Sequence, residues 1–192
     1  MFSGYSDVMG GSVVVNPQSP YHDTIIARLT ALYEEANFPL DVVTLARNCA
    51  DFVPRVHRCN LSTLSVLNLF SAHSSVEEVY HPLIGSRKST YERYRRARGG
   101  YGNLLSIIFR EPRSAIRFYD TLDVCKGTSF GTNFTLAVPY VQLAHYHDQD
   151  RVESYGIPKH IIRLSVGLES EHQILKAVAE ALAEVEKFEN IC

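Results

Sequence analysis

Arg163 lies in the segment IIRLSVGLE, residues 161–169, where the order of residue types indicates anion binding. It alternates with apolar neighbours on an expected strand, so its side chain can reach a cleft on one face of a sheet. A guanidinium at a strand end can hold a carboxylate through two parallel hydrogen bonds. The alternative is a structural ion pair with Glu169 or with an acid elsewhere in the chain.

A second candidate is the loop KGTSFGTNFT, residues 126–135. Two glycines bracket Ser129, and Thr128 precedes it. A loop of this composition can present hydroxyl and backbone N–H groups to a ligand. An ordinary turn is the alternative. The segment lacks the Walker pattern, which argues against a phosphate-binding loop.

Two other segments match known sites only in part. GGYGN, residues 99–103, imitates a dinucleotide-binding loop, but Leu105 occupies the third glycine position and a strand is expected to follow. HYHDQD, residues 145–150, contains His145 and His147, which would share a face on a strand but not on a helix. No third ligand can be assigned, so we expect neither a dinucleotide site nor a metal site.

A basic run between residues 87 and 98 is the remaining candidate. Such a run with interleaved tyrosines can contact nucleic acid, whereas a solvated charged face is the alternative. The whole chain has 19 Lys and Arg against 21 Asp and Glu, a formal net charge of -2, which argues against a nucleic-acid partner. The residues of the run are Arg87, Lys88, Tyr91, Arg93, Tyr94, Arg95, Arg96 and Arg98.

Composition predicts a packed, soluble chain that these candidate sites can be built on. Of 192 residues, 45% are hydrophobic and 21% are charged, which suits one sizeable domain or two small ones. No secretory signal is visible, and no apolar run approaches the roughly 18 residues that a membrane span needs. We therefore expect a cytoplasmic location, no membrane partner and free thiols at the four cysteines, Cys49, Cys59, Cys125 and Cys192.

Periodicity predicts the elements that must position the candidate residues. Helices alternate with short apolar strands, and the last helix begins at a capping box formed by Ser170 and Gln173. This order predicts an α+β domain with a small, mostly antiparallel sheet covered by helices. The expected helices are 21–35, 41–53 with Asp41 as its cap, 55–72, 114–122 and one from 171 onward, and the expected strands are 12–15, 76–82, 103–109 and 160–168.

Several motifs, taken together, resemble one enzyme family. SGYSDVMGG, VYHP, GGYGNLLSIIF, TSFGTNFTL and IRLSVGLE occur in the order and at the spacing of the Cys/Met metabolism (trans-sulfuration) pyridoxal-phosphate (PLP) enzymes. These are the cystathionine γ-synthases and the cystathionine β- and γ-lyases. The residues of the motifs are most similar to those of the fungal γ-synthase branch. The resemblance covers nearly the whole chain and corresponds to the C-terminal half of the family.

The resemblance implies a fold and a domain division. It implies the C-terminal domain of an aspartate-aminotransferase-like PLP enzyme. Residues 1–40 would be a remnant of the large PLP-binding domain, and residues 41–192 would be the small domain with its linking helices. Residues 13–15 would then form an exposed apolar edge.

The resemblance also implies a reaction and roles for three residues. An O-acylhomoserine would lose its ester group as a carboxylate, and cysteine would add in its place to give cystathionine, a step of methionine biosynthesis, with PLP as the electron sink. Arg163 would bind the α-carboxylate of the amino-acid substrate, and Ser129 would lie beside it. Thr128 departs from the family's usual glutamate, which leaves the choice of substrate open.

The chain departs from the family pattern at a position that is needed for catalysis. In the family the Schiff-base lysine lies in S-x-T-K, and here that position falls one residue before Met1. The resemblance therefore implies that the chain contains no catalytic residue, leaves its cofactor contacts unassigned and makes the isolated chain inactive. Full-length members are homo-oligomers. The alternatives are a truncated or split enzyme, a non-catalytic interaction module, and a cystathionine lyase-like member.

Overall fold

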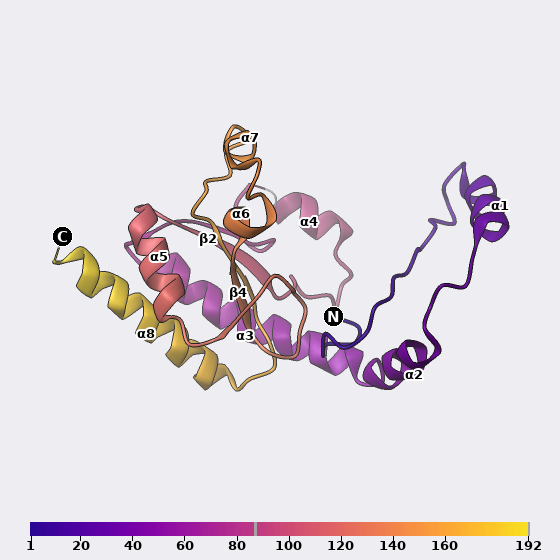
Figure 1. Ribbon diagram of the computed structural model, residues 1–192, viewed down its shortest axis with the longest axis horizontal. Helices are drawn as coiled ribbons and strands as arrows, with labels where there is room; N and C mark the ends of the chain where they lie inside the picture. Colours follow the sequence, from indigo (N-terminus) through magenta and orange to yellow (C-terminus); the bar gives the residue numbers. More distant parts are fainter. Residues whose placement is uncertain (87, 192) are drawn as a thin grey trace.

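Figure 1 shows the computed structural model of the chain, which describes every residue except 87 and 192. A five-stranded sheet runs through the body of the molecule, and helices cover both of its faces. The helices are α1 His22–Leu32, α2 Pro39–Asn48, α3 Phe52–Ala72, α4 Lys88–Tyr94, α5 Pro112–Thr121, α6 Tyr140–Ala144, α7 Gln149–Glu153 and α8 Glu171–Glu189. The strands are β1 Val76–Tyr80, β2 Leu104–Phe109, β3 Cys125–Lys126, β4 Leu136–Pro139 and β5 Ile162–Ser165.

The sheet has the strand order β1-β2-β5-β4-β3 and is antiparallel at every pair except β3 with β4. This arrangement confirms the predicted α+β fold with a mostly antiparallel sheet. Strand β5 lies at the centre, between β2 and β4. A central strand is fixed by hydrogen bonds on both sides, so a side chain that it carries has a well-defined position.

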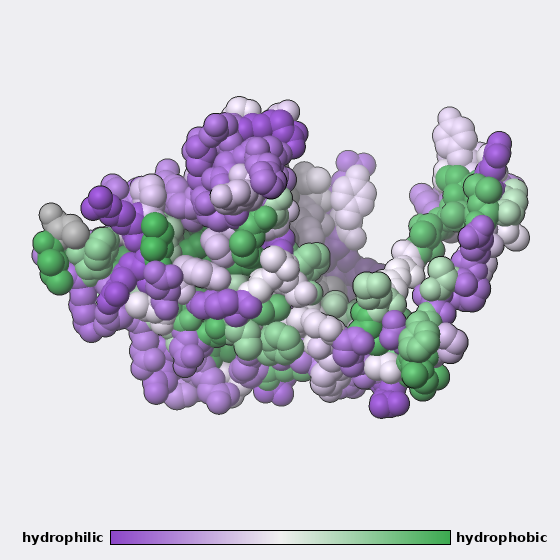
Figure 2. Space-filling model, in the orientation of Figure 1, coloured by the Kyte–Doolittle hydropathy of each residue, from purple (hydrophilic) through white to green (hydrophobic). Residues whose placement is uncertain are grey.

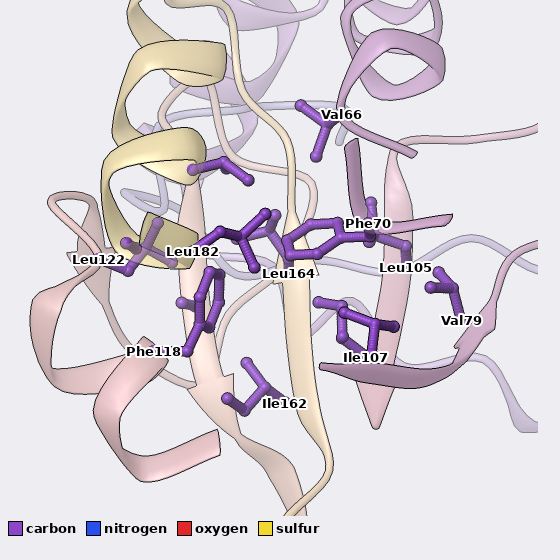
Figure 3. Packing of buried hydrophobic residues seen from close by; sticks show 14 of the residues in the cluster. Val66, Phe70, Val79, Leu105, Ile107, Phe118, Leu122, Ile162, Leu164 and Leu182 are labelled. Carbon is purple, nitrogen blue, oxygen red and sulfur yellow. The ribbon is translucent and has the colours of Figure 1, made fainter. Parts of the chain in front are cut away.

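Alternation along β2 divides the core between the two faces of the sheet. Leu105, Ile107 and Phe109 face the main cluster, which α3, α5 and α8 complete. Ile108 points the other way and packs with residues of α6 and α7. Figure 3 shows the main cluster, where Phe118 lies beside the sheet and its ring centroid is 5.5 Å from that of Phe70. Each buried side chain of this size contributes roughly 1.5–3 kcal/mol.

Helix α8 begins as the sequence predicts. The Gln173 N–H donates to Ser170 Oγ at 3.2 Å, and the Ser170 N–H donates to Gln173 Oε1 at 3.1 Å. Both members of the predicted capping box are therefore present. The apolar positions that follow, Ile174, Val178 and Val185, are buried against the sheet and α3.

The expected strand over residues 12–15 is wrong. In the described chain these residues belong to no strand, and Val13 and Val14 are 74% and 91% exposed. The exposed apolar character predicted for residues 13–15 is confirmed for Val13 and Val14, whereas Val15 is half-buried. The cap assigned to Asp41 is also wrong, because the second helix begins earlier, at Pro39, and Phe38 occupies the N-cap position.

Residues 12–48, here called the N-terminal arm, extend away from the body (Figure 1). No residue of α1 or α2 is buried. Figure 2 shows apolar surface gathered along this arm, at the right of the view. On α1, the apolar side chains of Ile25, Ile26 and Leu29 are 39–42% exposed, and Leu32 is 73% exposed.

The thiols Cys49, Cys59 and Cys125 are free, as predicted, and Cys192 lies outside the described residues. Burial raises the pKa of the Cys59 thiol, which donates to the Gly167 carbonyl at 3.4 Å. Among the described residues, no helix combines the length and the apolarity needed to cross a lipid bilayer.

Candidate functional site

Arg163 lies on the central strand β5, opposite Ser106 of β2 and Val138 of β4. Its Nη2 donates a hydrogen bond to the Thr128 carbonyl at 3.0 Å, so strand and loop meet at this residue. The guanidinium carbon is 4.4 Å from the ring centroid of Tyr140 and 5.0 Å from that of Phe130. Cation–π contacts with two rings restrict the orientation of the guanidinium.

The Nε of Arg163 is buried, and among the described residues none accepts a hydrogen bond from it. A buried donor without an acceptor costs about 1–3 kcal/mol, and a ligand oxygen would remove that cost. The structural ion pair with Glu169 is not formed. Both carboxylate oxygens of Glu169 instead accept from Thr135, from its N–H at 2.6 Å and its hydroxyl at 2.8 Å.

The loop of residues 128–135 is held by specific bonds on its inner side. The Gly131 N–H donates to Ser165 Oγ at 2.9 Å, and the Gly167 N–H donates to Thr135 Oγ1 at 3.0 Å. Gly131 has φ +72°, a conformation that favours glycine. On the outer side, Thr128 and Ser129 are exposed. The structure thus brings Thr128 to Arg163, with Ser129 as the next residue along the loop.

A cavity of ≈ 440 Å³ lies between the first residues of the chain and this loop. Phe130 links it to Arg163, because its ring lines the cavity and also contacts the guanidinium. No lysine lines the cavity. Its walls are Met1, Phe2, Ser3, Gly4, Ser6, Val8, Gly10, Gly11, Ser12, Leu45, Cys49, Phe130, Gly131 and Thr132.

Arg55 of α3 is a residue that the sequence analysis missed. Its side chain is only 6% exposed, although it carries a charge. The signal was present: Arg55 falls on the same helical face as the buried Cys59, Val66 and Phe70, where an arginine is unexpected. Its acceptors, described below, lie on the segments that form the cavity.

The remaining sequence candidates do not form a second site. His145 Nδ1 lies 3.1 Å from Asp148 Oδ1, and in the described part of the chain no group of three or more metal-ligating side chains is placed to hold an ion. Residues 99–103 precede a strand, as expected. In the basic run, Arg95 donates to Glu92 at 2.8 Å and to the Gly99 carbonyl at 2.7 Å, while Arg87 lies outside the described residues.

Known proteins similar to this chain agree on one family. The profile of the family described as "Cys/Met metabolism PLP-dependent enzyme" matches residues 1–183. A cystathionine gamma-synthase-like protein, ankD of Aspergillus thermomutatus, is 54% identical over 186 residues, which is 97% of this chain and 33% of the relative. The cystathionine gamma-synthase of Neurospora crassa is 37% identical over 187 residues, 97% of this chain and 30% of the relative.

Solved structures support the same fold. The cystathionine gamma synthase of Xanthomonas oryzae pv. oryzae, crystallised with cystathionine, matches with a TM-score of 0.81 at 23% identity. The match covers 97% of this chain and 48% of that one. The chain therefore spans about a third of the curated relatives and about half of the solved chain. Because the family profile covers nearly all of its residues, the chain belongs to the Cys/Met metabolism PLP-dependent enzyme family.

Proposed function

We propose that the chain is the substrate-binding, C-terminal part of a cystathionine γ-synthase-like enzyme. In this proposal, the sulfur of cysteine replaces the acyloxy group of an O-acylhomoserine, which leaves as a carboxylate, to give cystathionine. The observation that carries it is the buried, unpaired Nε of Arg163 beside two aromatic rings. A carboxylate matches this arrangement because it is planar and can accept from Nε and a neighbouring Nη together.

The other two residues of the site follow from their places in the loop. Ser129 offers a hydroxyl next to the bound carboxylate, and Thr128 faces the more distant part of the substrate. Thr128 lacks the charge of the glutamate that the family usually has, so it offers no ion pair to a cationic distal group. This supports an uncharged ester such as an O-acylhomoserine as the substrate.

PLP is the cofactor of this family, and it supplies an electron sink when bound. The residues of this chain do not fit its covalent attachment. Attachment needs an amine, and no lysine lines the cavity. Lys126, the lysine on the edge strand, is already bonded to the carbonyls of Tyr119 and Leu122 at 2.6 and 2.7 Å. We therefore propose that the isolated chain binds substrate groups but is catalytically inactive.

The domain division completes the proposal. Residues 1–40 belong to the large PLP-binding domain of the family, and residues 41–192 form the small domain. The exposed apolar surface of the N-terminal arm supports this division, because surface of that kind is normally covered by other parts of a fold. A homo-oligomer is proposed for the whole enzyme.

A second candidate is a lyase-like member. The cystathionine gamma-lyase of Lactobacillus plantarum matches the fold with the same TM-score, 0.81, at 22% identity. Such a protein would use the same Arg163 contact, so carboxylate binding supports both candidates. Only the reaction of the complete enzyme distinguishes them.

The binding proposal is tested by calorimetric titration of L-cystathionine into the purified chain. We expect binding, and we expect Arg163→Lys to weaken it at least about tenfold, because a lysine cannot form the bidentate contact. Arg113→Lys, a change at an exposed arginine of α5, is the matched control and should bind like the wild type. Equal affinity in Arg163→Lys and the wild type would contradict the assigned role.

The inactivity proposal has a separate test. The chain is mixed with PLP, reduced with borohydride and digested, and the peptides are examined by mass spectrometry. We expect no stoichiometric adduct at any single lysine. A stoichiometric adduct at one lysine would overturn the proposal, because the chain would then supply its own attachment point.

A further inference from the structure

The guanidinium of Arg55 is completely bonded. A guanidinium has five N–H donors, and here each of the five has an acceptor within hydrogen-bond distance. Nε donates to Asp51 Oδ1 at 2.7 Å. Nη1 donates to the Met1 carbonyl at 3.2 Å and to Asn133 Oδ1 at 2.9 Å, and Nη2 donates to the carbonyls of Phe2 and Asn48 at 2.6 Å each.

These acceptors belong to segments far apart in the sequence. Met1 and Phe2 lie 54 and 53 residues before Arg55, whereas Asn133 lies 78 residues after it. Asn48 ends α2, and Asp51 precedes α3. One buried side chain therefore joins the first residues of the chain, the junction of two helices and the loop of residues 128–135.

Gly4 shows how closely these segments approach. It has φ +77°, and a methyl group in place of its hydrogen would overlap both Asn133 Oδ1 and Arg55 Nη1. Its carbonyl accepts from the Asn133 N–H at 2.6 Å. The Asn133 carbonyl in turn accepts from the Leu168 N–H at 2.8 Å, beyond the end of β5.

Two of the three segments joined by Arg55 form facing walls of the cavity, which Leu45 and Cys49 complete. Residues 1–12 form one wall, and Phe130 to Thr132 form the other. Phe130 contacts Arg163, and Thr128 bonds to it. The position of the loop relative to residues 1–4 thus sets where Phe130, which lines the cavity, lies against Arg163.

We propose that Arg55 is a positioning residue that holds residues 1–4 against the loop of residues 128–135 and so shapes the site around Arg163. A planar, five-donor group is required because the five acceptors lie around its edge, and a lysine offers only three donors at one point. The effect on ligand binding rests on the proposed function. The effect of Arg55 on the positions of the two cavity walls does not depend on the proposed function.

The first test is hydrogen–deuterium exchange of the purified full chain, followed by mass spectrometry. In Arg55→Gln and Arg55→Lys, we expect exchange to become at least about tenfold faster in peptides covering residues 1–12 and 128–135. Exchange in α5 and α8 should stay as in the wild type. Arg58→Gln, a change at an exposed arginine of the same helix, is the matched control and should leave both walls unchanged.

Asn133→Ala gives a second approach that leaves the charge of Arg55 in place. It removes one acceptor, and we expect faster exchange in both walls again. If Arg55→Gln and Arg55→Lys fail to fold, the exchange rates of Asn133→Ala test the proposal instead. Unchanged exchange in residues 1–12 and 128–135 would overturn the proposal. So would an equal increase throughout α5 and α8, because Arg55 would then support only the overall fold.

Binding of L-cystathionine, measured by calorimetry, provides the readout that a general structural role would not move. We expect Arg55→Lys to bind at least about tenfold more weakly than the wild type, with Arg163 intact and exchange in α5 and α8 unchanged. Wild-type affinity in Arg55→Lys would overturn the link to the site. If the wild-type chain itself does not bind, the proposed function fails, while the exchange result still decides the role of Arg55.

Discussion

At the scale of single residues, the fit between the first residues and the loop depends on two glycines. Gly131 and Gly4 both have positive φ, and both lie where a side chain would meet the opposite segment. A methyl group at Gly131 would meet Met1. Small residues here are therefore a requirement of close packing as well as of backbone conformation.

Gly4→Ala tests this requirement. Gly85→Ala is its matched control, because Gly85 has a similar φ, +80°, but among the described residues, its chain neighbours aside, none has an atom within 4 Å of the added methyl group. We expect the control to lower the free energy of unfolding by about 1 kcal/mol, from the strained backbone alone. Gly4→Ala should lower it by ~3 kcal/mol, because steric overlap is added to the strain. Urea denaturation measures both, and equal losses would show that the packing contribution is absent.

The sequence identified Arg163 but not Arg55, and the reason is physical. Arg163 sits in a strand where alternation over a few residues shows which way its side chain points. The role of Arg55 depends on Met1, Phe2 and Asn133, whose distance from it in sequence is large. Local patterns contain no information about which distant carbonyls will surround a guanidinium. The helical periodicity of α3 could have predicted that Arg55 is buried, but it could not have predicted which residues accept its hydrogen bonds.

At the scale of elements, the long periodic segments and the strands β1 and β5 were predictable, whereas other short elements, such as β3 and β4, were not. The helix over 55–72 and the strand over 103–109 were found within a few residues, because each has several turns or alternations. β3 has only two residues and β4 four, so neither has a readable period. The expected strand over 12–15 was wrong although its sequence pattern is clear. Its apolar run is real, but pairing requires a neighbour that local sequence does not specify.

The capping box of α8 is an element whose contribution can be measured. Ser170→Ala removes the acceptor for the Gln173 N–H, and we expect it to lower the free energy of unfolding by about 1 kcal/mol. Ser170→Asp keeps an acceptor at the same place and should be close to the wild type. Both values come from urea denaturation followed by circular dichroism. A loss of the same size in Ser170→Asp would mean that the hydrogen bond is not responsible.

At the scale of the whole molecule, stability should depend on pH through one buried imidazole. His81 is 6% exposed, and burial lowers its pKa from the ordinary value of 6.5, opposed in part by the nearby backbone of Gly102. Its Nδ1 accepts from the Leu83 N–H at 3.3 Å. The folded protein therefore favours the neutral ring, whereas the unfolded chain takes up a proton near pH 6.5.

The sign of the effect follows from this difference. Above pH 6.5 the ring of His81 is neutral in both the folded and the unfolded state, so its contribution to the free energy of unfolding is fully present. As the pH falls below that value, the unfolded state binds a proton that the folded state does not, so stability declines. The slope from one such group is at most about 1.4 kcal/mol per pH unit.

His81→Gln tests the assignment. We expect a smaller decline of the free energy of unfolding between about pH 7 and about pH 5 than in the wild type. His57→Gln, a change at an exposed histidine of α3, should keep the wild-type decline. Urea denaturation at several pH values provides the measurement. An unchanged slope in His81→Gln would assign the pH dependence to other groups.

The Arg55 junction also dictates an order of events during synthesis. Residues 1–4 leave the ribosome long before Asn133 exists, yet their bonds to the Arg55 guanidinium and to the Asn133 N–H form one cluster. At roughly 5–20 residues per second, the wait lasts several seconds or longer. In that interval the exposed apolar arm is available to chaperones. Residues 1–4 therefore reach their final place only after more than a hundred later residues have been made.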